Sequence, residues 1–406
     1  MNEMLLQAYL RKDGRKGIRN LVVVAYLVEC AHHVSRRIVN LSGHTDVHLI
    51  GFPGCYPNDY AFRMMSAVCT HPNVGAALLV SLGCESMNRD RLLDIIRESG
   101  RPAELLVIQE SGGTLATIEA GVTAVRKLRA SIDSAPRVPM AVNELIIGTI
   151  CGGSDGTSGI SANPAVGRCF DFLVAEGAAC IFEETGELIG CEAVMADRAI
   201  TPLLAREIEA CVAKAEHYYR VMGFGSFAPG NADGGLTTLE EKSMGAYSKS
   251  GSSAISGLLK PGDIPPTGGL YLLDVVPDGE PRFGFPNISD NAEIVEMIAC
   301  GCHLTLFTTG RGSVVGSAIS PVIKVCANPQ TYQRLAGDMD INAGRILDGA
   351  ATLDEVGEEI YQKVLQVAAG APSLSEQLGH QEFILTYKSF EPVGPGCLPV
   401  RHAVSG

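Results

Sequence analysis

Three cysteines each follow a predicted strand, directly or within a few residues. This shared position suggests that they bind a ligand or take part in catalysis. They are Cys55, Cys84 and Cys151. In parallel sheets, ligands bind outside the carboxyl ends of the strands. A thiolate there is a nucleophile or a soft metal ligand, and thiolates together with carboxylates favour iron over magnesium. The alternative is that Gly-Cys turns after strands pack closely for structural reasons alone.

The polar segment 151–167, between a predicted strand and a predicted helix, suits the binding of an oxyanion or carboxylate. Its glycines allow close approach, and the backbone N–H groups at the start of a helix carry positive partial charge. No Gly-Lys-Ser/Thr follows, so this is not a Walker phosphate loop. A tight structural turn is the alternative. The side chains expected to bind substrate here are Ser154, Asp155, Ser158 and Asn163.

Carboxylates are concentrated at another strand end, where Glu183, Glu184, Glu187 and Glu192 lie within ten residues. Glu183 directly follows an apolar strand. A carboxylate in that position suits a hard divalent cation or acid–base work. A solvated acidic face is the alternative.

Lys242 lies in a polar, glycine-rich segment and is a candidate base. A desolvated lysine near a metal can abstract a proton from carbon, as in enolase-type sites. Because free lysine titrates near ~10.4, this role requires a lowered pKa. A solvated surface lysine is the alternative. Arg311, in a glycine turn after a strand, suits bidentate carboxylate recognition.

Short apolar runs alternate with helical patterns along the whole chain, which predicts an α/β fold. We expect two doubly wound, mostly parallel-sheet domains, an N-terminal domain at 1–135 and a C-terminal catalytic domain at 140–406. The proline-containing segment 131–139 is the expected linker. The Gly/Ser-rich segment 224–266 is expected to be a long loop, and loops of that length are usually functional.

The 406 residues carry 32 basic and 45 acidic side chains, a net charge of −13, which disfavours nucleic acid and anionic membranes as partners. No apolar stretch approaches the ~20 residues of a membrane-spanning helix. The N-terminus shows no secretory signal, so we expect a cytoplasmic protein whose thirteen cysteines are reduced.

Several blocks, taken together, resemble the altronate/galactarate dehydratase family. The resemblance runs from about residue 8 to 380, in the family's order. Its blocks include Tyr9–Asn20 (YLRKDGRKGIRN), the Gly54-Cys55 turn, Leu82-Gly-Cys-Glu85, Cys151-Gly-Gly-Ser-Asp155 with Ser161-Ala-Asn-Pro164, Glu184 to Glu192, Pro229-Gly-Asn231, Glu241-Lys-Ser243, Phe307-Thr-Thr-Gly-Arg311 and Asp340-Ile-Asn-Ala-Gly344.

The resemblance implies a hydro-lyase that dehydrates a sugar acid, altronate- or galactarate-like, to a 2-keto-3-deoxy acid, generally with Fe(II). In that reaction Lys242 would take the C2 proton, and Glu184 or Glu85 would protonate the departing 3-hydroxyl. Cys55, Cys84 and Cys151 would hold the metal, and Asn231 and Arg311 would join the substrate-binding residues. Mn(II), or an iron–sulfur cluster on the same cysteines, is the alternative cofactor.

Family members also carry a small SAF-type domain, either fused or as a separate subunit. This chain starts directly at the Tyr9 block, so we expect a possible small SAF-domain partner and a homo-oligomer. The sulfolactate sulfo-lyase large subunit, which eliminates sulfite, is the first alternative function. Cys55 and Cys84-Glu85 resemble the dehydratases more than the sulfo-lyases. A non-catalytic partner subunit is the second alternative.

Overall fold

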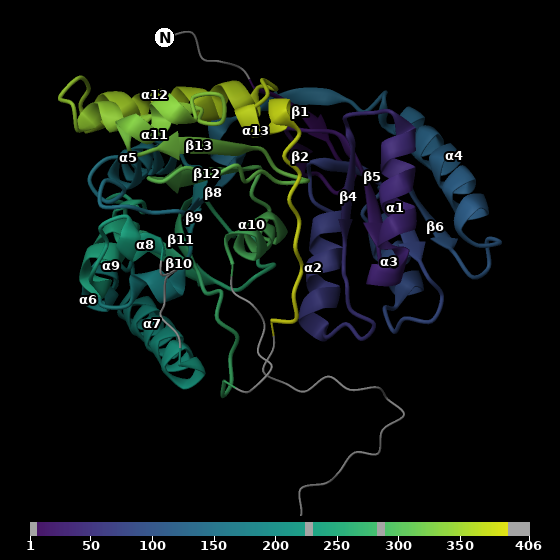
Figure 1. The fold of residues 1–406 in the computed structure, drawn as a ribbon, viewed down its shortest axis with the longest axis horizontal. Helices are drawn as coiled ribbons and strands as arrows, with labels where there is room; N and C mark the ends of the chain where they lie inside the picture. Colours follow the sequence, from purple (N-terminus) through teal and green to yellow (C-terminus); the bar gives the residue numbers. More distant parts are fainter. Residues whose placement is uncertain (1–5, 224–229, 282–288, 389–406) are drawn as a thin grey trace, which may run out of the picture.

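The computed structural model describes residues 6–223, 230–281 and 289–388, and two parallel sheets organise them (Figure 1). The N-terminal sheet has four strands in the order β4-β3-β5-β6. They are β3 (Leu21–Tyr26), β4 (Val47–Gly51), β5 (Val74–Ser81) and β6 (Ala103–Val107). Its connecting helices are α1 (Glu29–Ser42), α2 (Asp59–Cys69), α3 (Arg89–Glu98) and α4 (Thr114–Ile132).

Both faces of this sheet are covered, which explains its nearly continuous apolar strands. Val22 and Val24 pack in the core formed with α1 and α4, whereas Val23 and Ala25 pack in the core formed with α2 and α3. Side chains of a strand alternate between its two faces, so all positions of β3 before Tyr26 are buried.

The C-terminal sheet is also parallel, with seven strands in the order β10-β11-β9-β8-β12-β13-β14. Helices α5 and α12 pack together on one face, and α10 packs on the other, facing α2 of the N-terminal half. The strands are β8 (Ile146–Cys151), β9 (Ala179–Phe182), β10 (Ile255–Leu259), β11 (Gly269–Leu273), β12 (Leu304–Thr309), β13 (Val322–Cys326) and β14 (Ile341–Asn342). The helices are α5 (Ala162–Ala175), α6 (Glu192–Ala196), α7 (Pro202–Met222), α8 (Gly230–Asp233), α9 (Leu239–Ser248), α10 (Asp290–Ala299), α11 (Pro329–Arg334), α12 (Leu353–Ala368) and α13 (Leu374–Leu378). The predicted α/β class with mostly parallel sheets is confirmed.

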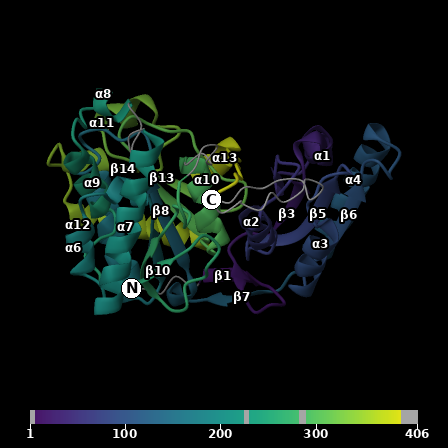
Figure 2. The same ribbon diagram turned by 90° about the horizontal axis from the view of Figure 1, so that it is seen from below.

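A small antiparallel sheet, β2-β1-β7, lies between the two halves (Figure 2). It joins β1 (Leu6–Leu10) and β2 (Lys16–Gly17) to β7 (Arg137–Met140). The expected linker at 131–139 is therefore not a free connection, because its second half pairs with β1. The basic Tyr9–Asn20 block turns here, and its buried Arg11 donates to the Pro72 carbonyl at 2.7 Å.

The predicted long loop at 224–266 is corrected by the structure. Residues 224–229 lie outside the described residues, but α8, α9 and β10 occupy much of the remainder. The overlooked signal was a capping box, since Thr238 accepts from the Glu241 N–H while Glu241 accepts from the Thr238 N–H. The segment after the carboxylates forms two helices, α6 and α7, which are separated before Pro202, the first residue of α7.

Within the described ranges, every helix is too short or too polar to cross a membrane.

Candidate functional site

The centre of the C-terminal sheet is where its strand order reverses. The chain passes from β8 to β9 on one side, and later places β12 on the other side of β8. Crevices at such switch points are the usual ligand sites of parallel sheets. Cys151, the last residue of β8, is buried at this point.

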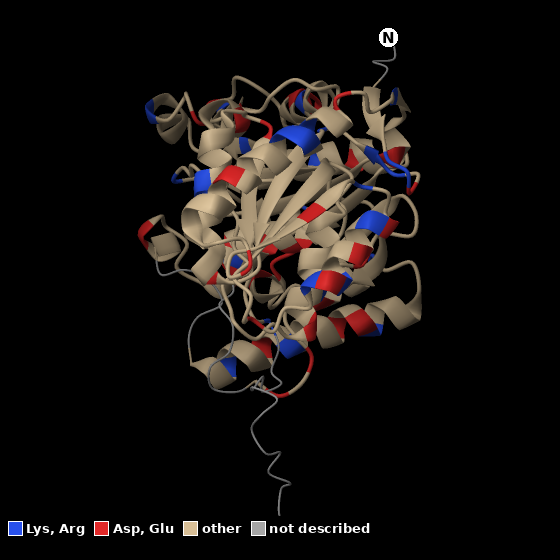
Figure 3. Ribbon diagram, turned by 90° about the vertical axis from the view of Figure 1, so that its right-hand side faces the viewer, with Lys and Arg blue, Asp and Glu red and all other residues tan. Residues whose placement is uncertain are grey.

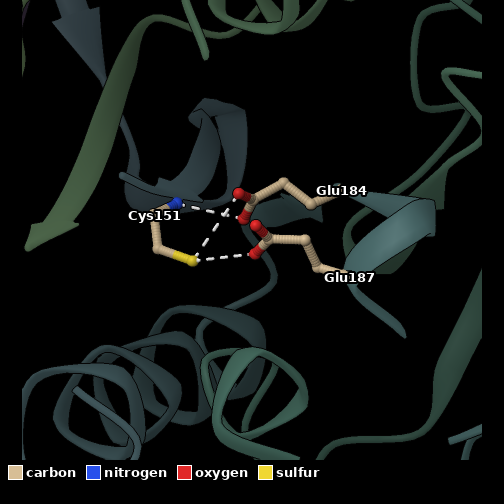
Figure 4. Close-up of side chains that lie close together, drawn as sticks. All are labelled: Cys151, Glu184 and Glu187. Atoms are coloured by element: carbon tan, nitrogen blue, oxygen red, sulfur yellow. Dashed lines mark hydrogen bonds between the residues drawn. The ribbon is translucent and has the colours of Figure 1, made fainter. Parts of the chain in front are cut away.

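Two carboxylates from the turn after β9 converge on Cys151 (Figure 4). The Cys151 backbone N–H donates to Glu184 Oε2 at 3.0 Å, and its thiol contacts Glu187 Oε2 at 3.3 Å and Glu184 Oε1 at 3.6 Å. Glu184 has φ 75°, and it is the one non-glycine residue in the described part of the chain with positive φ. Such strained backbone persists where surrounding contacts enforce it, and it concentrates at functional sites.

Two lysines from α9 and its end complete the group. Lys242 Nζ lies 3.3 Å from Cys151 Sγ and 3.1 Å from Ser154 Oγ, and it also contacts Glu187. Lys249 Nζ lies 3.5 Å from the same sulfur and forms an ion pair with Glu184. Both lysines are buried, at 2% and 0% exposure, so Lys242 is not the solvated surface lysine that was the alternative.

The expected lowering of the Lys242 pKa is not found. Burial by itself, the largest influence, lowers the pKa, but the negative charges of Cys151 and Glu187 outweigh it and raise the pKa above the usual lysine value. Lys242 therefore rests as an ammonium ion.

A cavity of about 520 Å³ opens beside Lys242, between the segment after β8 and α9. Ser154, Ser158 and Asn163 line it, so the structure brings these predicted binding residues together with Lys242. Asn163 also holds its own position, because its amide donates to the Gly245 carbonyl at 2.8 Å and accepts from Thr308 Oγ1 at 2.6 Å. The other lining residues are Gly156, Gly159, Ile160, Gly235, Leu236, Glu241, Met244 and Gly245.

Three other predicted binding residues lie nearby but do not line this cavity. Asp155 is buried and accepts a hydrogen bond from Asn328 Nδ2 at 3.0 Å. Asn231 is buried in α8, and the exposed Arg311 donates to the Gly230 carbonyl. The hydrogen bonds of Asp155 and Arg311 in this structure thus go to other groups of the protein.

The predicted cysteine set is not assembled. Cys55 and Cys84 are exposed on loops that follow β4 and β5 of the N-terminal sheet, whereas Cys151 ends β8 of the other sheet. Glu85, on the same loop as Cys84, accepts from the Gly83 N–H at 2.9 Å and does not join the Cys151 group. All three cysteines do follow strands, but the strands belong to two different sheets.

The residues that sequence reasoning left out of the site are Glu187 and Lys249. Their signal was spacing: Glu187 lies three residues after Glu184, and Lys249 lies seven after Lys242, which is two helical turns.

One group of potential metal ligands occurs in the described residues, namely Cys151, Glu184 and Glu187, with ligand atoms all within 4.8 Å of one another. One sulfur and two carboxylates suit a divalent transition metal in number and kind. Lys242 and Lys249 contact the same atoms, so a bound cation would take the place of their ammonium groups there.

The chain matches two family models that together cover most of it. Residues 142–390 match the C-terminal domain of D-galactarate/altronate dehydratase, and residues 8–133 match the second domain of D-galactarate dehydratase/altronate hydrolase.

Individual relatives are similar over most of this chain. The (2R)-sulfolactate sulfo-lyase subunit beta of Chromohalobacter salexigens is 32% identical over 397 residues, which are 93% of this chain and 96% of the relative. The altronate dehydratase of Escherichia coli K12 is 28% identical over 94% of this chain and 77% of its own length. The E. coli galactarate dehydratase (L-threo-forming) is 31% identical over 78% of this chain and 61% of its own length.

The buried Cys-Glu-Lys group at the switch point thus belongs to a chain that family models match over nearly its whole described length. The chain is a member of the D-galactarate/altronate dehydratase family, a family of hydro-lyase enzymes, as the sequence blocks had predicted.

Proposed function

We propose that this protein is a hydro-lyase that removes water from a sugar acid to give a 2-keto-3-deoxy acid. The observation that carries the proposal is Lys242, a buried amine that lines the cavity and contacts both Cys151 and Glu187. Lys242 and Glu241 are the titratable residues among the cavity lining, and Glu241 is exposed and engaged in the cap of α9.

Lys242 is the proposed base for the C2 proton. Since it rests as an ammonium, it must first release a proton through the cavity that it lines. Neutral Lys242 then accepts the C2 proton, and the resulting ammonium gives a proton to the departing 3-hydroxyl, which leaves as water. Formation of the C2–C3 double bond yields an enol, which tautomerises to the 2-keto acid.

The remaining cavity residues are proposed to orient the substrate. Ser154 Oγ, 3.1 Å from Lys242 Nζ, would hold a substrate oxygen beside the amine. Ser158 and Asn163 would bind further hydroxyls along the cavity, because they are buried polar groups in its wall. Glu184 is proposed to keep Lys249 and Cys151 in place, which is a change from its predicted role as acid.

Fe(II), or Mn(II), is proposed as cofactor. Cys151, Glu184 and Glu187 would hold it. When bound, the metal would polarise the carboxylate and 2-hydroxyl of the substrate and so stabilise the charge that develops on removal of the C2 proton.

A panel of aldonates and aldarates, assayed for 2-keto acid formation, tests the proposal. Turnover of one sugar acid, lost in Lys242→Ala, supports it. If iron-loaded protein forms no keto acid from any member of the panel, the result argues against the proposal.

A second candidate is carbon–sulfur cleavage, which eliminates sulfite in place of water. It is favoured by the 32% identity to the sulfolactate sulfo-lyase subunit over 96% of that relative. Including (2R)-sulfolactate in the panel, with sulfite release as readout, separates the two. Sulfite formation without dehydration of any sugar acid would favour this second candidate.

A small second subunit is also proposed, because that relative is named as one subunit of its enzyme. If such a subunit closes the cavity, the chain alone should show a low kcat, since an open site admits water and loses positioning. Co-purification of the chain from its native cells, followed by assay of the complex and of the chain alone, tests this. Equal kcat for both would contradict it.

A further inference from the structure

The cavity beside Lys242 is lined by residues of very different exposure, which separates a deep end from a mouth. Lys242 marks the deep end together with Ser154, Ser158 and Asn163, and each of these four residues is at most 2% exposed. Under the proposed function, the reacting carbon of the substrate lies at Lys242. The other end of a sugar acid therefore extends from the deep end toward the mouth.

The mouth of the cavity is apolar and acidic. Ile160 and Met244 line it, with 61% and 51% of their surfaces exposed. Glu241, which is also exposed, adds a carboxylate to the lining. That carboxylate accepts from the backbone N–H groups of Thr237 and Thr238 at 3.0 and 3.2 Å, so the cap of α9 holds its negative charge in place.

The cavity offers a single cationic side chain to an anionic substrate. Among the described residues that line it, Lys242 carries the only positive charge. Arg311, the cation predicted for carboxylate recognition, lies outside this lining and donates to the Gly230 carbonyl. A carboxylate at the far end of the substrate would lose part of its hydration against the apolar mouth and would face Glu241 without an opposite charge.

The charge of the whole chain acts in the same direction. The chain has 45 acidic and 32 basic side chains. Figure 3 shows acidic segments, in red, gathered at the lower end of the strands in its centre. Because repulsion grows with the charge of the approaching ion, this excess disfavours a doubly charged acid more than a singly charged one.

We infer that the protein acts on an aldonate, a sugar acid with one carboxylate and an uncharged far end. It discriminates against the corresponding aldarate, which carries a second carboxylate at that end. The inference rests on the proposed function, which by itself does not separate acids with one carboxylate from acids with two. Selection comes from the missing partner for the second carboxylate, since a site rejects a ligand whose charge it cannot pair.

Pairs of acids with the same configuration test the inference, because an aldonate and its aldarate differ only at the far carbon. For a pair that is turned over, kcat/KM of the iron-loaded full chain should be at least about tenfold higher for the aldonate. Ile160→Arg places a cation at the mouth and should raise kcat/KM for the aldarate by about tenfold or more. Leu115→Arg adds the same charge at an exposed position on α4, far along the chain from the cavity, and is the matched control that should leave the ratio unchanged.

Met244→Arg is the second variant, and it should shift the ratio in the same direction. An aldarate turned over as well as its aldonate overturns the inference. So does a parental ratio in both folded arginine variants. Should both variants unfold, the ratio measured on the parent chain decides.

Binding separates this inference from the proposed function. Calorimetric titration of the chelator-treated full chain, in which we expect no turnover, measures Kd for both acids of a pair. Tighter binding of the aldonate by a chain that dehydrates neither acid would contradict the proposed function alone. Equal binding, tighter binding of the aldarate or binding of neither acid overturns the inference, whereas dehydration of an aldarate would leave the proposed function standing.

Discussion

At the scale of single residues, the site is a compact set of opposite charges around one sulfur. Cys151, Glu184 and Glu187 face Lys242 and Lys249, and most of these side chains are nearly inaccessible to solvent. Buried charges of this kind are stable only when each has a partner of opposite charge. Removal of one member therefore leaves another buried charge without its partner, which destabilises the fold. Variants here must therefore be tested for fold as well as for activity.

Replacement of Lys242 tests the assignment of the base. Lys242→Ala should lower kcat by about 10²–10⁴-fold and stop exchange of the substrate C2 proton with solvent deuterium. NMR of the substrate in D₂O measures the exchange. Lys127→Ala, on the exposed surface, is the control. Exchange at the parental rate in Lys242→Ala would mean that another group removes the proton.

Removal of metal tests the cofactor. Treatment with a chelator should abolish turnover, and Fe(II) should restore it, because a metal on Cys151, Glu184 and Glu187 would stabilise the charge formed on proton removal. Metal analysis before and after treatment is the measurement. Undiminished turnover by protein proven free of metal would rule the cofactor out.

At the scale of elements, close backbone contacts fix the helix that carries both lysines. Helix α5 and the end of α9 meet at Gly167, where a Cβ would lie 2.2 Å from the Ser248 carbonyl oxygen. Asn163, in the first turn of α5, is hydrogen-bonded to Gly245 of α9. The position of Lys242 therefore depends on the absence of a side chain at Gly167 of α5.

Gly167→Ala should displace the end of α9. Overpacking of this kind costs about 1–3 kcal/mol in free energy of unfolding, and we expect kcat to fall as well because Lys242 and Lys249 move with the helix. Denaturant unfolding and steady-state kinetics measure the two effects. The exposed Ala175→Ser on the same helix is the control. A variant with parental stability and kcat would show that the contact relaxes freely.

At the scale of the whole molecule, buried and half-buried polar groups join the two halves. Asn73 donates to the carbonyls of His303 and Ile319, and Arg19 forms an ion pair with Glu376. The turn between β1 and β2 adds Asp13, which binds the guanidinium of the buried Arg101 at 2.8 Å. The basic N-terminal block thus helps to hold the two halves of the molecule together.

Asp13→Asn should lower the free energy of unfolding at neutral pH by about 1–3 kcal/mol, because Arg101 loses its charged partner. Burial opposes ionisation of Asp13, but hydrogen bonds from Arg15 and Arg101 outweigh it and lower its pKa to about 2. This stabilisation is present above the ordinary aspartate pKa and is lost as pH falls toward about 2.

Denaturant unfolding of both proteins between about pH 7 and pH 3 measures this dependence, and the difference between them should shrink below about pH 4. Asp133→Asn, which removes an exposed carboxylate, is the control. A difference that stays constant over this range would exclude the ion pair as its cause.

The sequence by itself determined the parallel α/β class and the family, and it singled out Cys151, Ser154, Glu184 and Lys242, which the structure brings together. These conclusions rest on local signals, since apolar runs bounded by turns report strands and short motifs report strand ends. The capping box at Thr238 shows that even α9 was encoded locally.

Only the tertiary structure decided which strand ends meet. Cys55 and Cys84 carry the same local signal as Cys151, yet they end strands of another sheet, and spacing along the chain does not report that separation. The charge state of Lys242 was equally beyond the sequence, because it depends on the burial and the acidic groups that folding places around it.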